Sequence, residues 1–417
     1  MSFALIWIIT LASIALMLLR PWGIPEVVWT SAGALSLCLL RLIPWSLARH
    51  AVAEGVDVYL FLAGMMLLSE LAKVQGVFDW LAGIAVKRGD GSPRRLFTLI
   101  YSVGTVVTIF MSNDATAVVL TPAVLSAIKQ AGAKPMPYLL ACAMIANAAS
   151  FVLPISNPAN LVVFHNAMPP LPAWLRMFAL PSLVAVVSTY GLLRWYSRRE
   201  LQESCRGAAP RARLSHLGKI SLGGILVVAA VLLIASALKL DLGLPTCLAA
   251  VAVACVAWIW ERSNPIHLLR QVSWSVLPLV AALFVMLEAV QRAGAAQWLH
   301  TAFVRSAAWP PAASAFALGG AVGFGTNLVN NLPLGLIVGT TLRSGSFPHL
   351  LEQTVLVGVD LGPNLSVTGS LATILWLMAL RRQGLHVSSW EFMKAGLFIL
   401  PISLLLTIAA IMLLQII

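Results

Sequence analysis

A polar cluster interrupts a long apolar stretch of the chain: Ser112, Asn113, Asp114 and Thr116 lie within the otherwise largely apolar residues 98–128. An ionised aspartate at the centre of a membrane-spanning helix costs about 2.5–3.5 kcal/mol on insertion scales, so such a group is by default a candidate functional site. Its carboxylate could bind and release a proton, while amide and hydroxyl groups can both donate to and accept from a solute. We therefore expect Asp114 at a water-reachable or protein-lined site.

Three further polar breaks follow, near Ser156, Asn327 and Asn364. The candidate substrate-binding residues are Ser112, Asn113, Asn157, Asn160, Asn327, Asn330, Asn331, Asn364, Thr368 and Ser370. Asp114 and Asp360 are the candidates for proton coupling. Because no Lys, Arg or His lies in any break and two acids would oppose an anion, this composition favours a neutral polyhydroxylated solute or a cation. The alternative for the Asn and Ser side chains is interhelical hydrogen bonding without a ligand.

Other chemistries lack their usual residues. The sequence has no Walker A, GxSxG or HExxH motif, and its five cysteines show no metal-ligand spacing, so we expect no cofactor, no metal and no enzymatic activity. Glu70 and Glu288 each precede a glycine near a basic residue, Lys73 and Arg292, which favours interfacial ion pairs. An intramembrane aspartyl protease built on Asp114 and Asp360 would leave the internal repeat described below unexplained.

Composition places the chain in the membrane. Of its 417 residues 60% are hydrophobic and 10% charged, and the mean hydropathy is +0.91. These values predict an all-α polytopic membrane protein. The net charge of +12 comes from basic residues scattered at the ends of apolar segments, without a nucleic-acid-binding motif, so we expect the lipid bilayer and not a nucleic acid as the partner.

The apolar segments predict about ten transmembrane helices and two re-entrant hairpins. The predicted spans are 3–19, 26–43, 56–72, 138–164, 177–195, 218–238, 244–260, 274–291, 354–380 and 395–414. The predicted hairpins, at 94–130 and 310–343, have arms that are short for a span and polar tips at mid-membrane, a geometry allowed only where the backbone is buried in protein or lines a cavity.

An internal repeat organises these segments. Glu70, Gly76, Trp80 and Leu81 recur at an offset of 218 residues, and the Asn113-Asp114 tip has a counterpart in the second hairpin at an offset of 217. The sequence thus predicts a first repeat at 1–195, with hairpin 94–130 and broken helix 138–164, a cytoplasmic linker at 196–217, and a second repeat at 218–417, with hairpin 310–343 and broken helix 354–380. Five spans in each half make the repeats inverted in topology.

The distribution of basic residues supports this orientation. If the Arg-rich linker is cytoplasmic, twenty of the 27 Lys and Arg residues fall on the cytoplasmic side, with both termini outside. Inverted repeats that bring broken elements to the membrane midplane are typical of secondary transporters. The sequence therefore predicts a transporter, on the strength of its architecture rather than of any single motif.

Several motifs resemble those of the bacterial arsenite/antimonite efflux permease (ArsB) family of the ion transporter superfamily. They are Asn113-Asp114-Ala115, Leu120-Thr121-Pro122, Asn330-Asn331-Leu332-Pro333, Asp360-Leu361-Gly362-Pro363-Asn364 and the segment 369–376. The resemblance covers the chain from about residue 56 to its end. It implies a multi-pass protein of the bacterial inner membrane that exports trivalent arsenic and antimony as hydroxides, driven by proton exchange or by an associated cytoplasmic ATPase subunit. It also favours an elevator-type alternating-access mechanism.

Three alternatives remain open on the sequence alone. Two aspartates with amide and carbonyl oxygens could hold Na⁺, as in a sodium/proton antiporter of the same superfamily. A carboxylate carrier is disfavoured because the breaks lack basic residues. The chain could also be the passive membrane subunit of an ATPase-driven pump, with the basic segments 87–95 and 196–217 docking the ATPase. The neutral hydroxide As(OH)3 suits amide and hydroxyl groups best.

Overall fold

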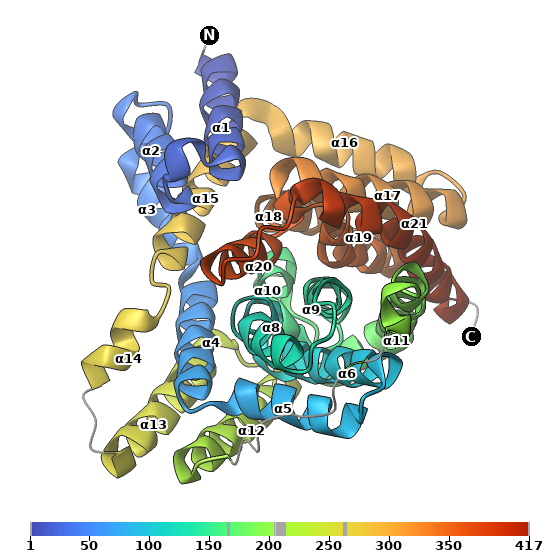
Figure 1. Ribbon diagram of the computed structural model, residues 1–417. Helices are drawn as coiled ribbons and strands as arrows, with labels where there is room; N and C mark the ends of the chain where they lie inside the picture. The colour runs from blue at the N-terminus through green and yellow to red at the C-terminus, as the bar shows by residue number, and fades with distance from the viewer. Residues whose placement is uncertain (1, 165–166, 204, 206–213, 262–264, 416–417) are drawn as a thin grey trace.

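The computed structural model describes residues 2–164, 167–203, 205, 214–261 and 265–415, which form helices joined by short connections, without a strand in those ranges (Figure 1). The helices up to residue 196 are α1 (Ser2–Leu19), α2 (Glu26–Leu39), α3 (Trp45–Glu54), α4 (Val56–Val74), α5 (Val77–Gly89), α6 (Pro93–Met111), α7 (Asn113–Ala115), α8 (Thr121–Gln130), α9 (Met136–Ala148), α10 (Pro158–Phe164) and α11 (Leu171–Tyr196). Those that follow are α12 (His216–Ala237), α13 (Gly243–Glu261), α14 (Pro265–Gln271), α15 (Val276–Val290), α16 (Ala296–Ala307), α17 (Pro311–Val329), α18 (Asn331–Arg343), α19 (His349–Leu361), α20 (Leu371–Arg382) and α21 (Ser389–Leu414). Residues 204 and 206–213 of the predicted linker lie outside the described residues.

The number of long apolar helices differs from the predicted ten. Seven described helices are long and apolar enough to cross a membrane, or eight if α3 and α4, bent by 49° at their junction, count as one span. The first arms of the two predicted hairpins, α6 and α17, belong to this set because each has 19 residues, so the prediction that these arms are short was wrong. The segments 3–19 and 26–39 form shorter apolar helices, and the segments 138–164 and 354–380 each contain two short helices around a polar break.

The chain reverses direction sharply at two polar residues. Ser112, between α6 and α7, has φ 111° and ψ 160°, and Asn330, between α17 and α18, has φ 79° and ψ 151°. This backbone region is essentially restricted to glycine and costs about 1–3 kcal/mol for other residues. Each residue still donates its backbone N–H to a threonine carbonyl one helical turn earlier, on Thr108 and Thr326 respectively. Both turns therefore have the same construction.

The first hairpin returns along α6 through a widened helical turn. Residues Thr116–Leu120 form a π-helical segment between α7 and α8, a feature that often marks functional sites. The hydroxyl of Thr116 lies 2.8 Å from that of Thr108, which ties the returning arm to α6. Pro122 follows the segment and lacks the N–H that a regular helix would need there.

The two polar breaks are built alike. In the first, a 3-10 turn (Pro154–Ser156) precedes Asn157, whose side chain accepts the N–H of Ala159 at the start of α10. In the second, a 3-10 turn (Val367–Gly369) precedes Ser370, whose hydroxyl accepts the N–H of Thr373 in α20. Such N-terminal caps satisfy helix N–H groups that would otherwise be buried without a partner.

Figure 1 shows α8, α9 and α10 in the middle of the molecule, with α6, α11, α19 and α20 around them. The most extensive pairings join α4 with α13, α17 with α19 and α11 with α21. Small residues permit the closest approaches. A Cβ on Gly362, after α19, would lie 2.3 Å from the carbonyl oxygen of Gly323 on α17, so the two backbones are in direct contact there.

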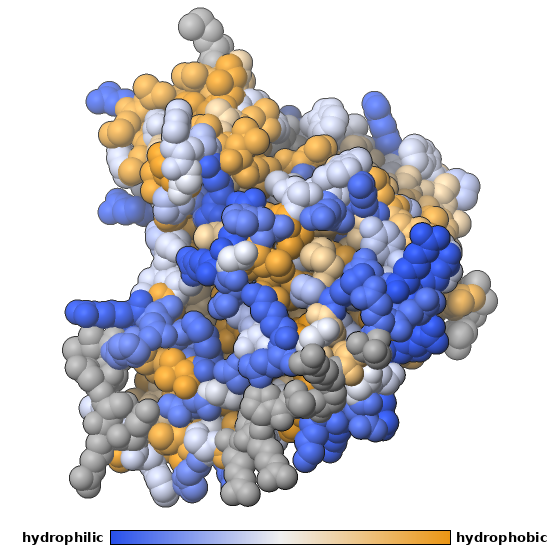
Figure 2. Space-filling view, in the orientation of Figure 1, coloured by the Kyte–Doolittle hydropathy of each residue, from blue (hydrophilic) through white to orange (hydrophobic). Residues whose placement is uncertain are grey.

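The outer surface of the bundle is apolar in the way a lipid-facing surface requires. Large hydrophobic side chains are exposed on α12, α13 and α21, among them Leu226, Ile234, Leu248 and Leu405. Figure 2 shows hydrophobic side chains gathered over α1 and α2 at the upper left and hydrophilic ones across the centre of the same view. Exposed apolar patches of this extent are typical of membrane contact.

Candidate functional site

A small cavity lies where the tip of the first hairpin meets α4. Its volume is about 60 Å³. Its lining includes Ser112 and Asp114 of the hairpin, Ser69 and Glu70 of α4, and Ser273 just before α15. The Asp114 side chain is half-buried and has no hydrogen-bond or ion-pair partner among the described residues. An unpaired carboxyl group at a cavity inside an apolar bundle is available to a proton or a ligand.

Glu70 is a residue of this cavity that the sequence analysis did not include among the site residues. Its side chain is buried, and its Oε1 lies 2.8 Å from Lys73 Nζ, one turn along α4. The predicted ion pairs are confirmed here and at Glu288, whose Oε1 lies 3.6 Å from Arg292 Nε. Glu70, however, also faces the hairpin tip. The sequence does not reveal that Glu70 and Asp114 line the same cavity, because they are far apart along the chain. Only the packing of α4 against the hairpin brings the two acids together.

A larger cleft adjoins the Asp114 cavity. It has a volume of about 660 Å³ and shares Ser273, Val276 and Leu375 with the smaller cavity. Its rim carries Arg20, Arg381 and Arg382, together with Glu26 and Thr368. Arg20 is paired with Glu26, whereas Arg381 and Arg382 are exposed at the end of α20. The cleft is therefore lined in part by basic residues and borders the acidic cavity.

A second group of predicted site residues forms a buried hydrogen-bond network between the two halves of the chain. Asn157, in the first break, donates to Asp360 Oδ1 on α19 over 2.8 Å. Reciprocally, Ser370 in the second break donates to Asn147 Oδ1 on α9 over 3.4 Å, and Asn147 donates to Asn364 Oδ1 over 3.0 Å. All five side chains are at most 2% exposed. Each break is thus bonded to the helix that precedes the other break.

Two polar atoms of the network make no hydrogen bond within the described part of the chain. Asp360 Oδ2 and Asn364 Nδ2 are buried without a hydrogen-bond partner among the described residues. Leaving such groups unpaired costs about 1–3 kcal/mol each. Side chains that served only to bond neighbouring helices to one another would not have to bear this cost. These atoms are available to a proton, a water molecule or a solute that reaches the centre of the bundle.

The remaining predicted residues hold the breaks and tips in shape. Asn160 Nδ2 donates to the Ser150 carbonyl over 2.9 Å within the first break. Asn327 donates to the Gly362 carbonyl over 3.1 Å and accepts the Ser366 hydroxyl over 2.8 Å. These bonds agree with the alternative that the sequence left open for them, hydrogen bonding without a ligand.

Four more of these residues belong to the hairpin tips and the second break. Asn330 Nδ2 donates to the Thr368 carbonyl over 3.1 Å, and Thr368 also lines the large cleft. Asn113 and Asn331 are buried at the first positions of the returning arms, and Asn113 Oδ1 has no partner among the described residues. Of the predicted residues, the structure therefore brings Ser112 and Asp114 to the small cavity and Thr368 to the cleft.

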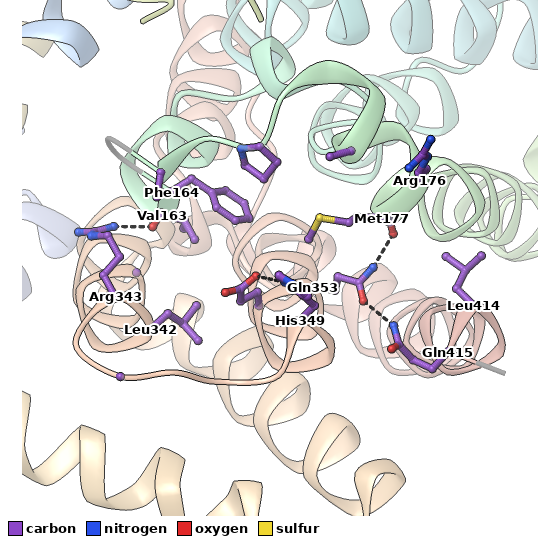
Figure 3. A pocket seen from close by; sticks show the side chains of 16 residues that line it. Val163, Phe164, Arg176, Met177, Leu342, Arg343, His349, Gln353, Leu414 and Gln415 are labelled. Carbon is purple, nitrogen blue, oxygen red and sulfur yellow. Dashed lines mark hydrogen bonds and ion pairs between the residues drawn. The ribbon is translucent and has the colours of Figure 1, made fainter. Parts of the chain in front are cut away.

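A third cavity, about 860 Å³ in volume, lies among the ends of α10, α11, α18, α19 and α21 and contains none of the predicted site residues (Figure 3). Two of its polar side chains are engaged in bonds that join these elements. Arg343 donates to the Val163 carbonyl over 2.7 Å, and Gln353 donates to the Met177 carbonyl over 2.9 Å. Its acidic side chain, Glu352, is paired with His349, whereas the carboxyl group of Asp114 is unpaired among the described residues, so the cavity at Asp114 is the stronger candidate site despite its smaller size.

Comparison with known proteins decides the family. Residues 3–356 match the citrate transporter family (CitMHS), which is well over half of the chain. The chain belongs to this family. Membership identifies the chain as a membrane transporter.

Individual relatives indicate which kind of citrate transporter family member the chain resembles. The chain is 24% identical over 382 residues to the arsenical pump membrane protein of Yersinia enterocolitica, covering 88% of this chain and 87% of the relative. It is 24% identical over 385 residues to the arsenical pump membrane protein of Escherichia coli strain K12, with the same coverage. It is 23% identical over 417 residues to a putative arsenical pump membrane protein of Bacillus subtilis, covering 93% and 94%. The predicted resemblance to the ArsB family is thereby confirmed.

A solved structure shows the same fold. The YdaH transporter of Alcanivorax borkumensis superposes with a TM-score of 0.57 at 15% identity, covering 88% of this chain and 86% of that one. The all-helical membrane fold expected from composition is confirmed. Together with the apolar helices and the bacterial relatives, these comparisons identify this citrate transporter family member as a multi-pass protein of the bacterial inner membrane.

Proposed function

We propose that this protein exports trivalent metalloid hydroxides, arsenite and antimonite, from the cytoplasm in exchange for protons. The observation that carries the proposal is the unpaired carboxyl group of Asp114, which lies in a small, mainly apolar cavity that contains three serines and adjoins a larger cleft. The relatives named arsenical pump membrane proteins support the choice of cargo. Metalloid hydroxides are neutral near pH 7 and carry several O–H groups, so carboxylate, amide and hydroxyl oxygens suit them.

The coupling step uses the proton-accepting capacity of Asp114 and Asp360. Asp114 binds a proton on the outside and releases it inside while cargo moves outward, and Asp360 assists from the central network. One proton crossing a membrane potential of 100 mV supplies about 2.3 kcal/mol. At about 1.4 kcal/mol per tenfold ratio, this supports roughly a fifty-fold gradient of a neutral solute, which is sufficient for resistance.

The motion proposed is an elevator built on two inverted repeats. The element bounds support the repeats: α6 and α17 each have 19 residues and start 218 residues apart, at Pro93 and Pro311. Likewise α9 and α19 each have 13 residues and start 213 residues apart, at Met136 and His349. The bend residues are Ser112 and Asn330, also 218 apart, which supports an alignment of Asn113 with Asn331 at an offset of 218 instead of 217. In this scheme the hairpins and broken helices are the carrier, and α4 with α13 belongs to the stationary frame.

Transport in everted membrane vesicles tests this proposal. With an acidic lumen and no ATPase, arsenite should accumulate inside the vesicles, because their lumen corresponds to the outside of the cell. Dissipating the proton gradient should release it. Accumulation that requires a sodium gradient, or that appears only with the ATPase subunit present, would replace proton antiport by the corresponding alternative.

A second candidate function is the transport of an organic anion. It is favoured by Arg381 and Arg382 at the rim of the cleft and by the name of the family, citrate transporter. The acidic residues Asp114 and Glu70 deeper along the same path oppose it, because they repel an anion. Uptake of labelled citrate by the same vesicles, competed by arsenite or not, separates the two candidates.

A further inference from the structure

The cavity at the hairpin tip is formed by two separate parts of the molecule. Asp114 and Ser112 come from the hairpin, while Glu70 and Ser69 come from one turn of α4. Helix α4 packs chiefly against α13 and also contacts α10 and the Thr116–Leu120 segment of the hairpin, so the α4–α13 group and the hairpin group meet at this cavity. A solute in this cavity would touch both groups at once.

Two hydroxyl groups in the cavity are free to bond a ligand. Ser69 and Ser112 are only 8% and 4% exposed, and neither hydroxyl has a hydrogen-bond partner among the described residues. A buried serine in a helix can bond its hydroxyl to a carbonyl one turn earlier, as Ser403 of α21 does here, and Ser69 of α4 does not. Hydroxyls that forgo this bond at a cavity wall are free to bond its contents.

We propose that Glu70 and Ser69 of α4 complete the cargo site, so that a small neutral hydroxide is held between the hairpin and α4. This inference rests on the proposed function and adds residues outside the carrier to it. The carboxylate of Glu70 accepts cargo O–H groups, a charge-assisted bond that is stronger than a neutral one. Lys73 holds Glu70 through its Oε1 and leaves Oε2 for the cargo.

The size and charge of the site explain its choice of cargo. A water molecule needs about 10–15 Å³ of accessible volume, so the cavity of about 60 Å³ has room for one compact solute or a few water molecules. A di- or tricarboxylate would meet two acidic side chains there. A trihydroxide of a trivalent metalloid is compact and neutral, and it offers its protons to Glu70 and Asp114.

Substitutions on α4 test the proposal in everted vesicles, with the KM and maximal rate for arsenite as readouts. Glu70→Gln should raise the KM about ten-fold, as expected for the loss of a hydrogen bond to a charged group. Ser69→Ala should raise it about three-fold, and this variant removes a hydroxyl that bonds nothing in the resting protein. Glu288→Gln, at the repeat-equivalent position and also ion-paired, is the matched control and should leave the KM unchanged.

Lys73→Met separates cargo binding from the ion pair. It removes the partner of Glu70 but keeps the carboxylate, so the KM should stay near that of the wild type. The proposal is overturned if Glu70→Gln and Ser69→Ala both keep the wild-type KM, or if Lys73→Met reproduces the effect of Glu70→Gln. Wild-type vesicles that accumulate no arsenite would overturn the proposed function and this inference with it, whereas unchanged variants in a working transporter overturn the inference alone.

Discussion

The amide of Asn157 donates a 2.8 Å hydrogen bond to Asp360 Oδ1, although the two residues are 203 positions apart in the chain. The bond joins the first polar break to the helix before the second break. Together with the reciprocal contact from Ser370 to Asn147, it shows that residues from both halves of the chain form the hydrogen-bond network at the centre of the bundle. For Asn157 and Asn147, the bonding partner comes from the other half of the chain.

Removal of the acceptor should destabilise this centre. Asp360→Ala leaves the Asn157 amide buried without a partner and should lower the free energy of unfolding by about 1–3 kcal/mol. Asp360→Asn keeps an acceptor oxygen at the same place and should cost less. Unfolding in detergent measures both, and the double variant with Asn157→Ala should lose less than the sum of the two single losses. Strictly additive losses would show that the two side chains are not coupled.

The bend at Ser112 predicts a conflict between stability and transport. Ser112 occupies a backbone region essentially restricted to glycine, and its hydroxyl contributes no bond to the fold. Ser112→Gly should therefore raise the free energy of unfolding by about 1 kcal/mol, while it weakens arsenite transport by removing a cargo ligand. Ser112→Ala should weaken transport to a similar degree without the gain in stability. A glycine variant no more stable than the alanine variant would show that the bend is unstrained.

Close backbone packing predicts a sharp difference between two glycines. Gly362→Ala places a Cβ 2.3 Å from the Gly323 carbonyl oxygen, where no flexible side chain can yield, and overpacking of this kind costs about 1–3 kcal/mol. Gly320→Ala, on the same helix as Gly323, meets nothing within 4 Å and should be tolerated. Folded yield and thermal unfolding in detergent compare the two. Equal stability of both variants would contradict the close contact between α17 and the segment after α19.

Thiol labelling tests the predicted topology. In a background without the five native cysteines, an impermeant thiol reagent added to intact cells should label a cysteine at Ser346. It should not label one at Gln383 until the cells are opened. Both positions are exposed, so access to the reagent depends on the side of the membrane alone. Labelling of both positions in intact cells would contradict the orientation derived from the basic residues.

The fold class could be predicted from the sequence because it depends on composition and on the length of apolar runs. The places where helices break were also readable, since Asn, Ser and Pro within an apolar run disfavour a continuous helix. The number of helices long enough to cross the membrane was harder to predict from the sequence. Whether an arm such as α6 is long enough to span depends on where its cap lies, and Ser92 caps it earlier than the apolar pattern indicates.

The partners within the site could not be predicted. Asn157 and Asp360 are both visible as polar residues in apolar surroundings, but the bond between them depends on how two distant segments pack. Glu70 illustrates the same limit, because its ion pair with Lys73 is local and was predicted, while its position at the Asp114 cavity is tertiary. The equivalence of Ser112 with Asn330 likewise required the backbone angles of the two bends.

The central claim is that Asp114 carries the proton that drives export. The measurement is arsenite accumulation in everted vesicles with an acidic lumen and no ATPase, for the wild type, Asp114→Asn, and Asp79→Asn as a control at an exposed carboxylate on α5. The account predicts that the wild type and Asp79→Asn accumulate arsenite and release it when the gradient collapses, while Asp114→Asn folds normally and accumulates none. Wild-type accumulation by Asp114→Asn would contradict the assignment of the proton site.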